Sequence, residues 1–225
     1  MESLEADLER ARALDVDALA DAVESIGFEC TRCGACCKGY VDCGDDAGAG
    51  DPHTATVFPD EVRDLQAATD YDWRDVARPM PYGLSGEGED AAGETFEWAL
   101  ETDDCGDCTF YEEADDATGR CTVHGDRPLI CRTYPFSVVL DGTSQPMGGV
   151  VDREGPVRAH ECEGLGREIA REDAEALARA LKERAVRELE EAIAVRESYE
   201  PTDAEGVVVH DSEGQKRPDG SVLDG

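Results

Sequence analysis

The residues best suited to chemistry are the cysteines, of which the chain has ten. Four of them, Cys30, Cys33, Cys36 and Cys37, form a C-x2-C-x2-C-C run. A C-x2-C pair lets two thiolates converge on one cation, and Gly34 permits the positive φ that such a turn can need. C-x2-C-x2-C is the spacing of many iron–sulfur sites with a fourth ligand from elsewhere, whereas C-x2-C is equally a zinc half-site. The run therefore predicts a metal site and leaves the metal open.

Two other interpretations of these thiols are weaker. Adjacent Cys36 and Cys37 are poorly placed to bond each other, so a disulfide framework is not favoured. The N-terminal residues MESLEADLERAR are too charged for a signal peptide, and no apolar stretch is long enough to span a membrane. We therefore expect a cytoplasmic protein, where clustered thiols more often bind metal or do redox chemistry than form disulfides.

A second group of motifs extends the constellation. The sequence contains C-T-F-Y from Cys108, C-T-V-H from Cys121, R-P-L-I-C-R-T-Y-P-F around Cys131 and C-E-G-L-G from Cys162. With these motifs the chain resembles the YkgJ-type cysteine-cluster proteins, also described as a zinc- or iron-chelating domain. That family's pattern is CxxCGxCC, then C-x-[FY], then C-x-[IV]-[YH]-x-x-RP-x-x-CRxYP, then a late Cys followed by glycines.

The resemblance covers roughly residues 28–166 and implies a set of metal ligands. The cysteines on its positions are Cys30, Cys33, Cys36, Cys37, Cys108, Cys121, Cys131 and Cys162. Cys43 and Cys105 are not part of the pattern. Members are often called iron–sulfur oxidoreductases, and the family is also similar to the metal-binding part of flagellin lysine N-methylases.

Eight thiols exceed the needs of one tetrahedral zinc ion. They would suit two zinc ions, or one four-iron cluster with further cysteines for redox chemistry or a second metal. Nearby basic residues could offset the thiolate charge, although each could instead pair a carboxylate or cap carbonyls: Arg32, Lys38, Arg127 and Arg132. His124 and His160 are weaker candidate ligands, whereas His53 and His210 are expected to be solvated.

The charge of the chain excludes some classes of partner. Its 225 residues include 54 acidic and 21 basic side chains, for a formal net charge of -33. Such a surface repels nucleic acids and anionic membranes. Because the acidic residues are spread along the chain, we favour adaptation to a high-salt cytoplasm over an ordinary acidic protein. The redox or protein partner stays unidentified, and a monomer is slightly preferred.

Around the thiols we expect a small α+β fold. Asp15 is a candidate N-cap and Gly27 a candidate stop for a helix in an N-terminal arm over 1–27. Residues 28–166 should form the cysteine-cluster domain, with metal-organised loops and a short antiparallel sheet in which Phe136–Leu140 turns at Asp141-Gly142 into a strand from Gly149. An amphipathic helix over 167–197, with an apolar stripe that includes Leu181 and Leu189, should pack on this domain. The acidic tail 198–225 should be disordered.

The sequence supports three functions in decreasing order. The first is an iron–sulfur protein with a redox or electron-transfer role, and the second is a zinc- or iron-chelating structural or interaction module without catalysis. The third, implied by the resemblance, is a transferase related to protein-lysine methylases. No nucleotide-binding, zinc-protease or serine-hydrolase motif is visible, so enzymatic activity is left undecided. The first cysteine segment and the four later family cysteines should converge in one region.

Overall fold

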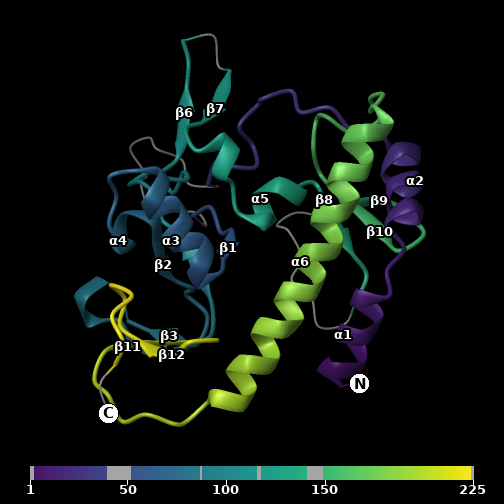
Figure 1. Cartoon of the computed structure of the whole chain (residues 1–225). Coiled ribbons are helices and arrows are strands. Elements are labelled where there is room, and N and C mark those ends of the chain that lie inside the picture. The colour runs from purple at the N-terminus through teal and green to yellow at the C-terminus, as the bar shows by residue number, and fades with distance from the viewer. Residues whose placement is uncertain (1–2, 40–51, 87, 116–117, 141–148, 224–225) are drawn as a thin grey trace. The chain divides into compact units, whose positions relative to one another are not determined.

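The computed structural model describes residues 3–39, 52–86, 88–115, 118–140 and 149–223 (Figure 1). Its α-helices are α1 (Leu4–Arg12), α2 (Val16–Ile26), α3 (Pro59–Ala68), α4 (Trp73–Val76), α5 (Leu129–Thr133) and α6 (Arg171–Ser198). Its strands are β1 (Thr56–Val57), β2 (Ala77–Pro79), β3 (Leu84–Ser85), β4 (Ala92–Thr95), β5 (Trp98–Leu100), β6 (Tyr111–Glu113), β7 (Gly119–Cys121), β8 (Phe136–Val138), β9 (Val150–Glu154), β10 (Val157–His160), β11 (Val207–Asp211) and β12 (Gly214–Lys216). Helices and small, mainly antiparallel sheets confirm the α+β class. None of the described helices is long and apolar enough to cross a membrane.

The chain divides into two units that interleave along the sequence. The first comprises Met1–Cys36, Glu112–Arg120 and Leu129–Ile193. The second comprises Cys37–Tyr111, Cys121–Pro128 and Ala194–Gly225. The expected boundaries after residues 27, 166 and 197 do not coincide with this division, and α6 contributes residues to both units.

The N-terminal arm of the first unit consists of two helices. The Asp15 carboxylate accepts hydrogen bonds from the amides of Asp17 and Ala18, at 2.9 and 3.2 Å, and so caps α2. Gly27 ends α2 with φ of 76°. Both capping predictions are confirmed, whereas a separate α1 before the cap was not expected.

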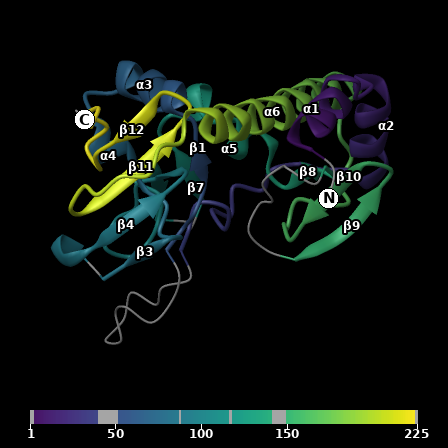
Figure 2. The same ribbon diagram turned by 90° about the horizontal axis from the view of Figure 1, so that it is seen from below.

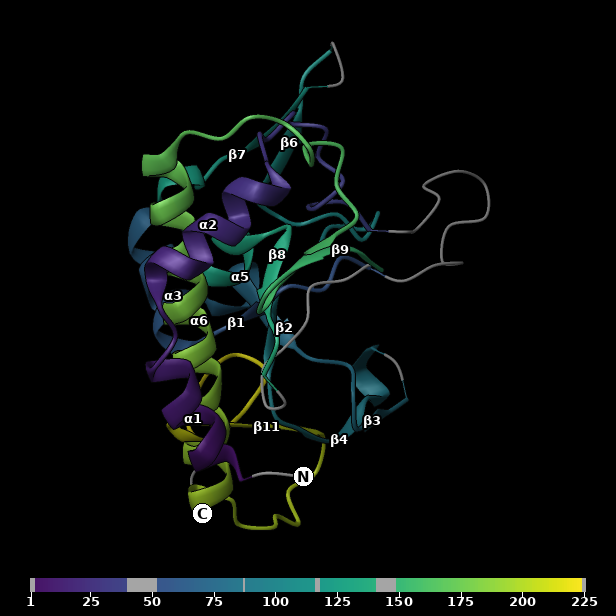
Figure 3. The ribbon, with the colours of Figure 1, turned by 90° about the vertical axis from the view of Figure 1, so that its right-hand side faces the viewer.

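The core of the first unit lies between helices and one face of a sheet. Apolar residues of α1, α2 and α6 pack with residues of β8 and β10 (Figures 1 and 3). On α6 the expected stripe is confirmed, because Leu181 and Leu189 are buried in this core. The sheet order is β8-β10-β9, so the expected hairpin between β8 and the strand after Gly149 is wrong. β10 lies between those two strands, because its Val157 and Ala159 complete the apolar face.

The second unit contains two small sheets, β1-β5-β2 and β12-β11-β4-β3. α3 begins at Pro59, because proline is favoured at the first position of a helix, and α4 is capped by Asp72. β11 pairs in parallel with β4 and antiparallel with β12 (Figure 2). Residues 198–225 were expected to be disordered, whereas the structure contains the strands β11 and β12 in this range. Their polar side chains have buried partners, described below, that composition could not reveal.

Candidate metal centre

The backbone brings the first cysteine segment beside the last one. Phe28 forms an antiparallel bridge with Leu165, and the amide of Glu29 donates to the carbonyl of Gly164 at 3.0 Å. Phe28 also packs its ring edge-on against Phe136 of the buried sheet face. Cys30 lies just after this bridge in the chain, and Cys162 lies just before it. The packing of Phe28 in the core of the first unit therefore fixes the backbone positions of both cysteines.

Two glycines make this approach possible. A Cβ at Gly164 would overlap the carbonyl oxygen of Glu29, and a Cβ at Gly27 would overlap the carbonyl oxygen of Arg167. Gly27 also has a positive φ, which side chains other than glycine rarely adopt. The glycine after the late cysteine is therefore needed for close backbone contact, which gives a physical reason for the C-E-G motif.

The segment between Cys30 and Cys36 turns twice into the left-handed region. Gly34 has φ of 78°, as predicted, and Arg32 has φ of 59°. The carbonyl of Arg32 accepts a hydrogen bond from the amide of Gly119 at 2.7 Å. This contact helps to hold a conformation that is unfavourable for arginine. No motif in the sequence indicated the positive φ of Arg32.

Three thiols of the first cysteine segment lie close enough to Cys162 to affect its thiol. Burial raises the pKa of the Cys162 thiol, and the nearby thiolates of Cys33, Cys36 and Cys30 raise it further. The amide of Gly164 donates to Cys162 Sγ at 3.4 Å, which acts in the opposite direction by stabilising the thiolate. Cys30 and Cys36 are exposed, whereas Cys33 and Cys162 are half-buried. A bound cation would relieve the repulsion among four thiolates, so the donor set suits a metal ion or an iron–sulfur cluster.

Cys131 belongs to the same unit and lies on the short helix α5. The buried Arg184 of α6 supports this helix, because its guanidinium donates to Thr133 Oγ1 at 3.1 Å and to Glu188 at 2.7 Å. Thr133 in turn donates to the carbonyl of Leu129 at 2.7 Å. The structure thus fixes the backbone of Cys131, and its role as a ligand stays a prediction.

The remaining family cysteines, Cys37, Cys108 and Cys121, lie in the second unit. The amide of Cys108 donates to the carbonyl of Cys37 at 2.8 Å, so these two residues are neighbours. The amide of Thr122 donates to the carbonyl of Phe110 at 2.9 Å, which aligns the segment after Cys121 with the segment after Cys108. The run C-C at 36–37 therefore supplies one thiol to each unit, and convergence of all eight stays a prediction.

Cys105 differs from the family cysteines. It is disulfide-bonded, whereas the eight family cysteines are present as thiols. Its bond removes it from the possible metal ligands. Cys43 lies outside the described residues.

The histidines and basic residues near the motifs have structural contacts. His160 is buried, with its Nε2 2.9 Å from Ser137 Oγ. Arg127 Nε donates to the carbonyl of His124 at 3.1 Å, and Lys38 Nζ lies 5.4 Å from the centre of the Tyr111 ring. The contacts of Arg127 and Lys38 agree with the alternative that these basic side chains have structural roles.

His53 is buried rather than solvated, and burial together with Arg78 lowers its pKa to about 4.

The described residues contain no set of three or more His, Cys, Asp or Glu side chains in an arrangement that could hold a metal ion directly. The thiols of Cys30, Cys33, Cys36 and Cys162 are therefore not arranged as metal ligands in this structure, although the first three lie close enough to affect Cys162. What supports the site is the donor set and the backbone contacts that bring Cys30 and Cys162 together.

Comparison with known proteins gives one match. The model of the CxxCxxCC family, described as "Putative zinc- or iron-chelating domain", matches residues 29–163. No curated protein and no solved structure matches the chain. The matched range begins one residue before Cys30 and ends one residue after Cys162, so it contains the whole candidate centre.

Proposed function

The chain belongs to the CxxCxxCC family, and from this membership we propose that it carries an iron–sulfur cluster with a redox or electron-transfer role. The proposed ligands of the cluster are Cys30, Cys33, Cys36 and Cys162. The observation that carries the assignment is the backbone contact between the Cys30 and Cys162 segments within one unit, made by the Phe28–Leu165 bridge and the hydrogen bond from Glu29 to Gly164.

The spacing of the ligands favours a cluster over a single zinc ion. Three cysteines at two-residue intervals with a distant fourth form the arrangement of many iron–sulfur sites. Structural zinc sites with four cysteines more often combine two separate C-x2-C pairs. The Gly164 amide donates a hydrogen bond to Cys162 Sγ. Hydrogen bonds to ligand sulfurs of this kind tune the reduction potential of a cluster.

A zinc- or iron-chelating module without catalysis is the second candidate. Its support is the family description, which names zinc as well as iron. In this case the metal would organise the loops around Cys30 and Cys162 and contribute folding free energy. The lysine-methylase relationship has no further support from the described residues.

Cys37, Cys108, Cys121 and Cys131 are proposed as additional thiol ligands. In the second unit, Cys37, Cys108 and Cys121 would serve a second metal or supply redox-active thiols, and Cys131 would supply a further thiol in the first unit. An electron-transfer role requires a redox partner, which we propose to be another protein. The eight thiols favour a reducing cytoplasm, and the net charge of -33 favours a high-salt one.

Anaerobic purification distinguishes the two candidates. The wild-type chain should be brown, with iron and acid-labile sulfide in comparable amounts. Cys162→Ser should lose most of the iron, whereas the matched variant Glu163→Gln, which changes an exposed neighbour, should keep it. A colourless protein with stoichiometric zinc would exclude the cluster. Full metal retention by Cys162→Ser would exclude the ligand assignment.

A further inference from the structure

The face of the β8-β10-β9 sheet that points away from the core carries a row of polar residues. Arg158 of β10 pairs with Ser137 of β8 on one side and with Arg153 of β9 on the other. Directly paired residues project to the same face of a sheet, at about 5 Å between Cβ atoms. The core face is occupied by the alternate residues Phe136, Val138, Val157 and Ala159. Two arginines are therefore cross-strand neighbours on the opposite face.

This pairing of like charges is unfavourable without an anion. The chain has 54 acidic residues, and other arginines of the same unit use them: Arg12 bonds Glu190 at 2.9 Å and Arg179 bonds Glu175 at 2.8 Å. In contrast, neither Arg153 nor Arg158 has an ion pair with any carboxylate in the described ranges. Two arginines thus occupy paired positions of the sheet in a strongly acidic protein, with no ion pair to a carboxylate among the described residues.

Arg158 provides a second observation. Its Nε is buried and has no hydrogen-bond partner. A buried donor without an acceptor is costly, and most such donors in proteins are satisfied by protein, water or ligand. Ser137, the directly paired residue of β8, is not a partner of this Nε, and its Oγ lies 2.9 Å from His160 Nε2. Arg153 is exposed, so the row is open to solvent at its outer end.

We propose that Arg153 and Arg158 form a binding site for a phosphate group, either inorganic phosphate or a small phosphate monoester. Two guanidinium forks match the oxygens of a phosphate, and its dianion balances their two charges. The acidic surface around the site disfavours longer polyanions such as nucleic acids. The proposal is independent of the metal centre, although β10 leads directly to Cys162.

Titration calorimetry with inorganic phosphate, at constant ionic strength set by KCl, tests this site. Saturable binding is expected in the wild-type chain, and Arg158→Gln and Arg153→Gln should each weaken it about tenfold or more. Arg158→Lys should retain part of the affinity. Arg120→Gln is the matched control, because Arg120 lies in the same unit and is paired with Glu112.

Further measurements distinguish inorganic phosphate from a phosphate monoester as the ligand and define the results that would refute the proposed site. Tighter binding of a phosphate monoester such as glycerol phosphate than of inorganic phosphate would identify an ester as the ligand, and the reverse order would identify the free ion. Absence of saturable phosphate binding, or equal affinity in both glutamine variants and the wild type, would refute the proposal. If Arg158→Gln fails to fold by circular dichroism, the exposed Arg153 variant still decides. Arg153→Gln should keep the metal content of the wild type, which separates this site from the metal centre.

Discussion

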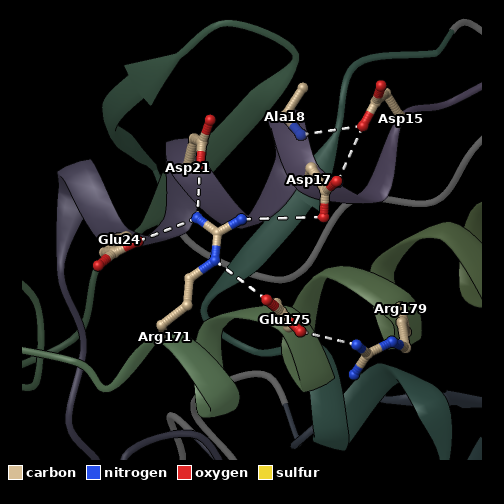
Figure 4. A network of polar contacts seen from close by, with 8 residues as sticks. All are labelled: Asp15, Asp17, Ala18, Asp21, Glu24, Arg171, Glu175 and Arg179. Atoms are coloured by element: carbon tan, nitrogen blue, oxygen red, sulfur yellow. Dashed lines mark hydrogen bonds and ion pairs between the residues drawn. The ribbon is translucent and has the colours of Figure 1, made fainter.

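The two units contain ion networks of opposite kinds. In the first unit, Arg171 of α6 contacts three carboxylates of α2 and one of its own helix (Figure 4). In the second unit, Lys216 of β12 contacts Asp211 at 2.9 Å and Glu213 at 2.7 Å. The arginine has more partners, but its side chain is 39% exposed, whereas the side chains of Lys216 and Asp211 are 3% and 1% exposed.

Burial therefore decides what each network contributes. Water and salt screen the arginine, and such exposed pairs contribute between zero and about 1 kcal/mol each. In the buried network the loss of one partner leaves the other charged and desolvated. Trp98 Nε1 also donates to Asp211 at 2.8 Å, and Lys216 Nζ lies 5.3 Å from the centre of the Trp73 ring. The number of ion pairs is thus a poor guide to stability in this chain.

Lys216→Met gives the largest expected effect. The buried Asp211 carboxylate would lose its cation, which should lower the free energy of unfolding by about 3–5 kcal/mol. Urea unfolding followed by circular dichroism measures this change. Arg217→Met, which alters the exposed neighbour, should change the value by less than about 0.5 kcal/mol. Equal effects of the two variants would contradict the importance of burial.

His53 makes the second unit sensitive to pH. Its pKa is about 4 in the folded chain and 6.5 in the unfolded chain, because burial and Arg78 disfavour the charged ring. The unfolded state therefore binds the extra proton between these values, and stability should rise by ~3 kcal/mol from pH 4 to pH 7. Below about pH 4 this contribution is absent.

Comparison with the His53→Gln variant separates the pH dependence caused by His53 from that of the carboxylates, which also titrate in acid. The difference in unfolding free energy between wild type and variant should depend on pH within this window and be constant above it. A difference that is constant from pH 4 to pH 7 would show that His53 titrates normally.

Trp98→Phe tests the neutral member of the buried network. Phenylalanine removes the indole donor to Asp211 and part of the buried ring volume, which should cost about 2 kcal/mol. Combining it with Lys216→Met should give less than the sum of the two single effects, because both variants act on Asp211. Strict additivity in a double-mutant cycle would mean that the two contacts are independent.

Arg171→Gln should have the smallest effect. Loss of its exposed pairs with α2 should lower the urea midpoint of unfolding only slightly in about 0.1 M KCl. The difference should shrink in about 1 M KCl, where the Debye length falls from ~10 Å to ~3 Å. Denaturation of both proteins at the two salt concentrations measures this, and a loss as large as that of Lys216→Met that salt does not reduce would overturn the contrast with Lys216.

Local signals in the sequence identified much of the fold. Asp15 and Gly27 mark the ends of α2, and the stripe through Leu181 and Leu189 identifies α6, because caps and periodicity act within a few residues. The pairing of β11 with β4 was not predictable, since it joins segments far apart in sequence. The tail looked disordered because its polar residues have no local partners, whereas Asp211 and Lys216 bond each other and Trp98.

The candidate centre was predictable in its residue types more than in its geometry. Cysteine spacing indicated the run from Cys30 to Cys36, and the family motif indicated Cys162. Neither revealed that Gly164 must lack a side chain to approach Glu29, nor that Arg32 adopts a positive φ. Such backbone contacts depend on the tertiary packing of distant segments, which spacing alone does not contain.

The bridge between Phe28 and Leu165 has a consequence for biosynthesis. More than half of the chain separates Cys36 from Cys162, and at roughly 5–20 residues per second the ribosome needs on the order of ten seconds to produce the last of the four thiols. Until then the first three are an incomplete and exposed set. Metal loading of this centre should therefore follow translation, after β10, which leads to Cys162, has formed.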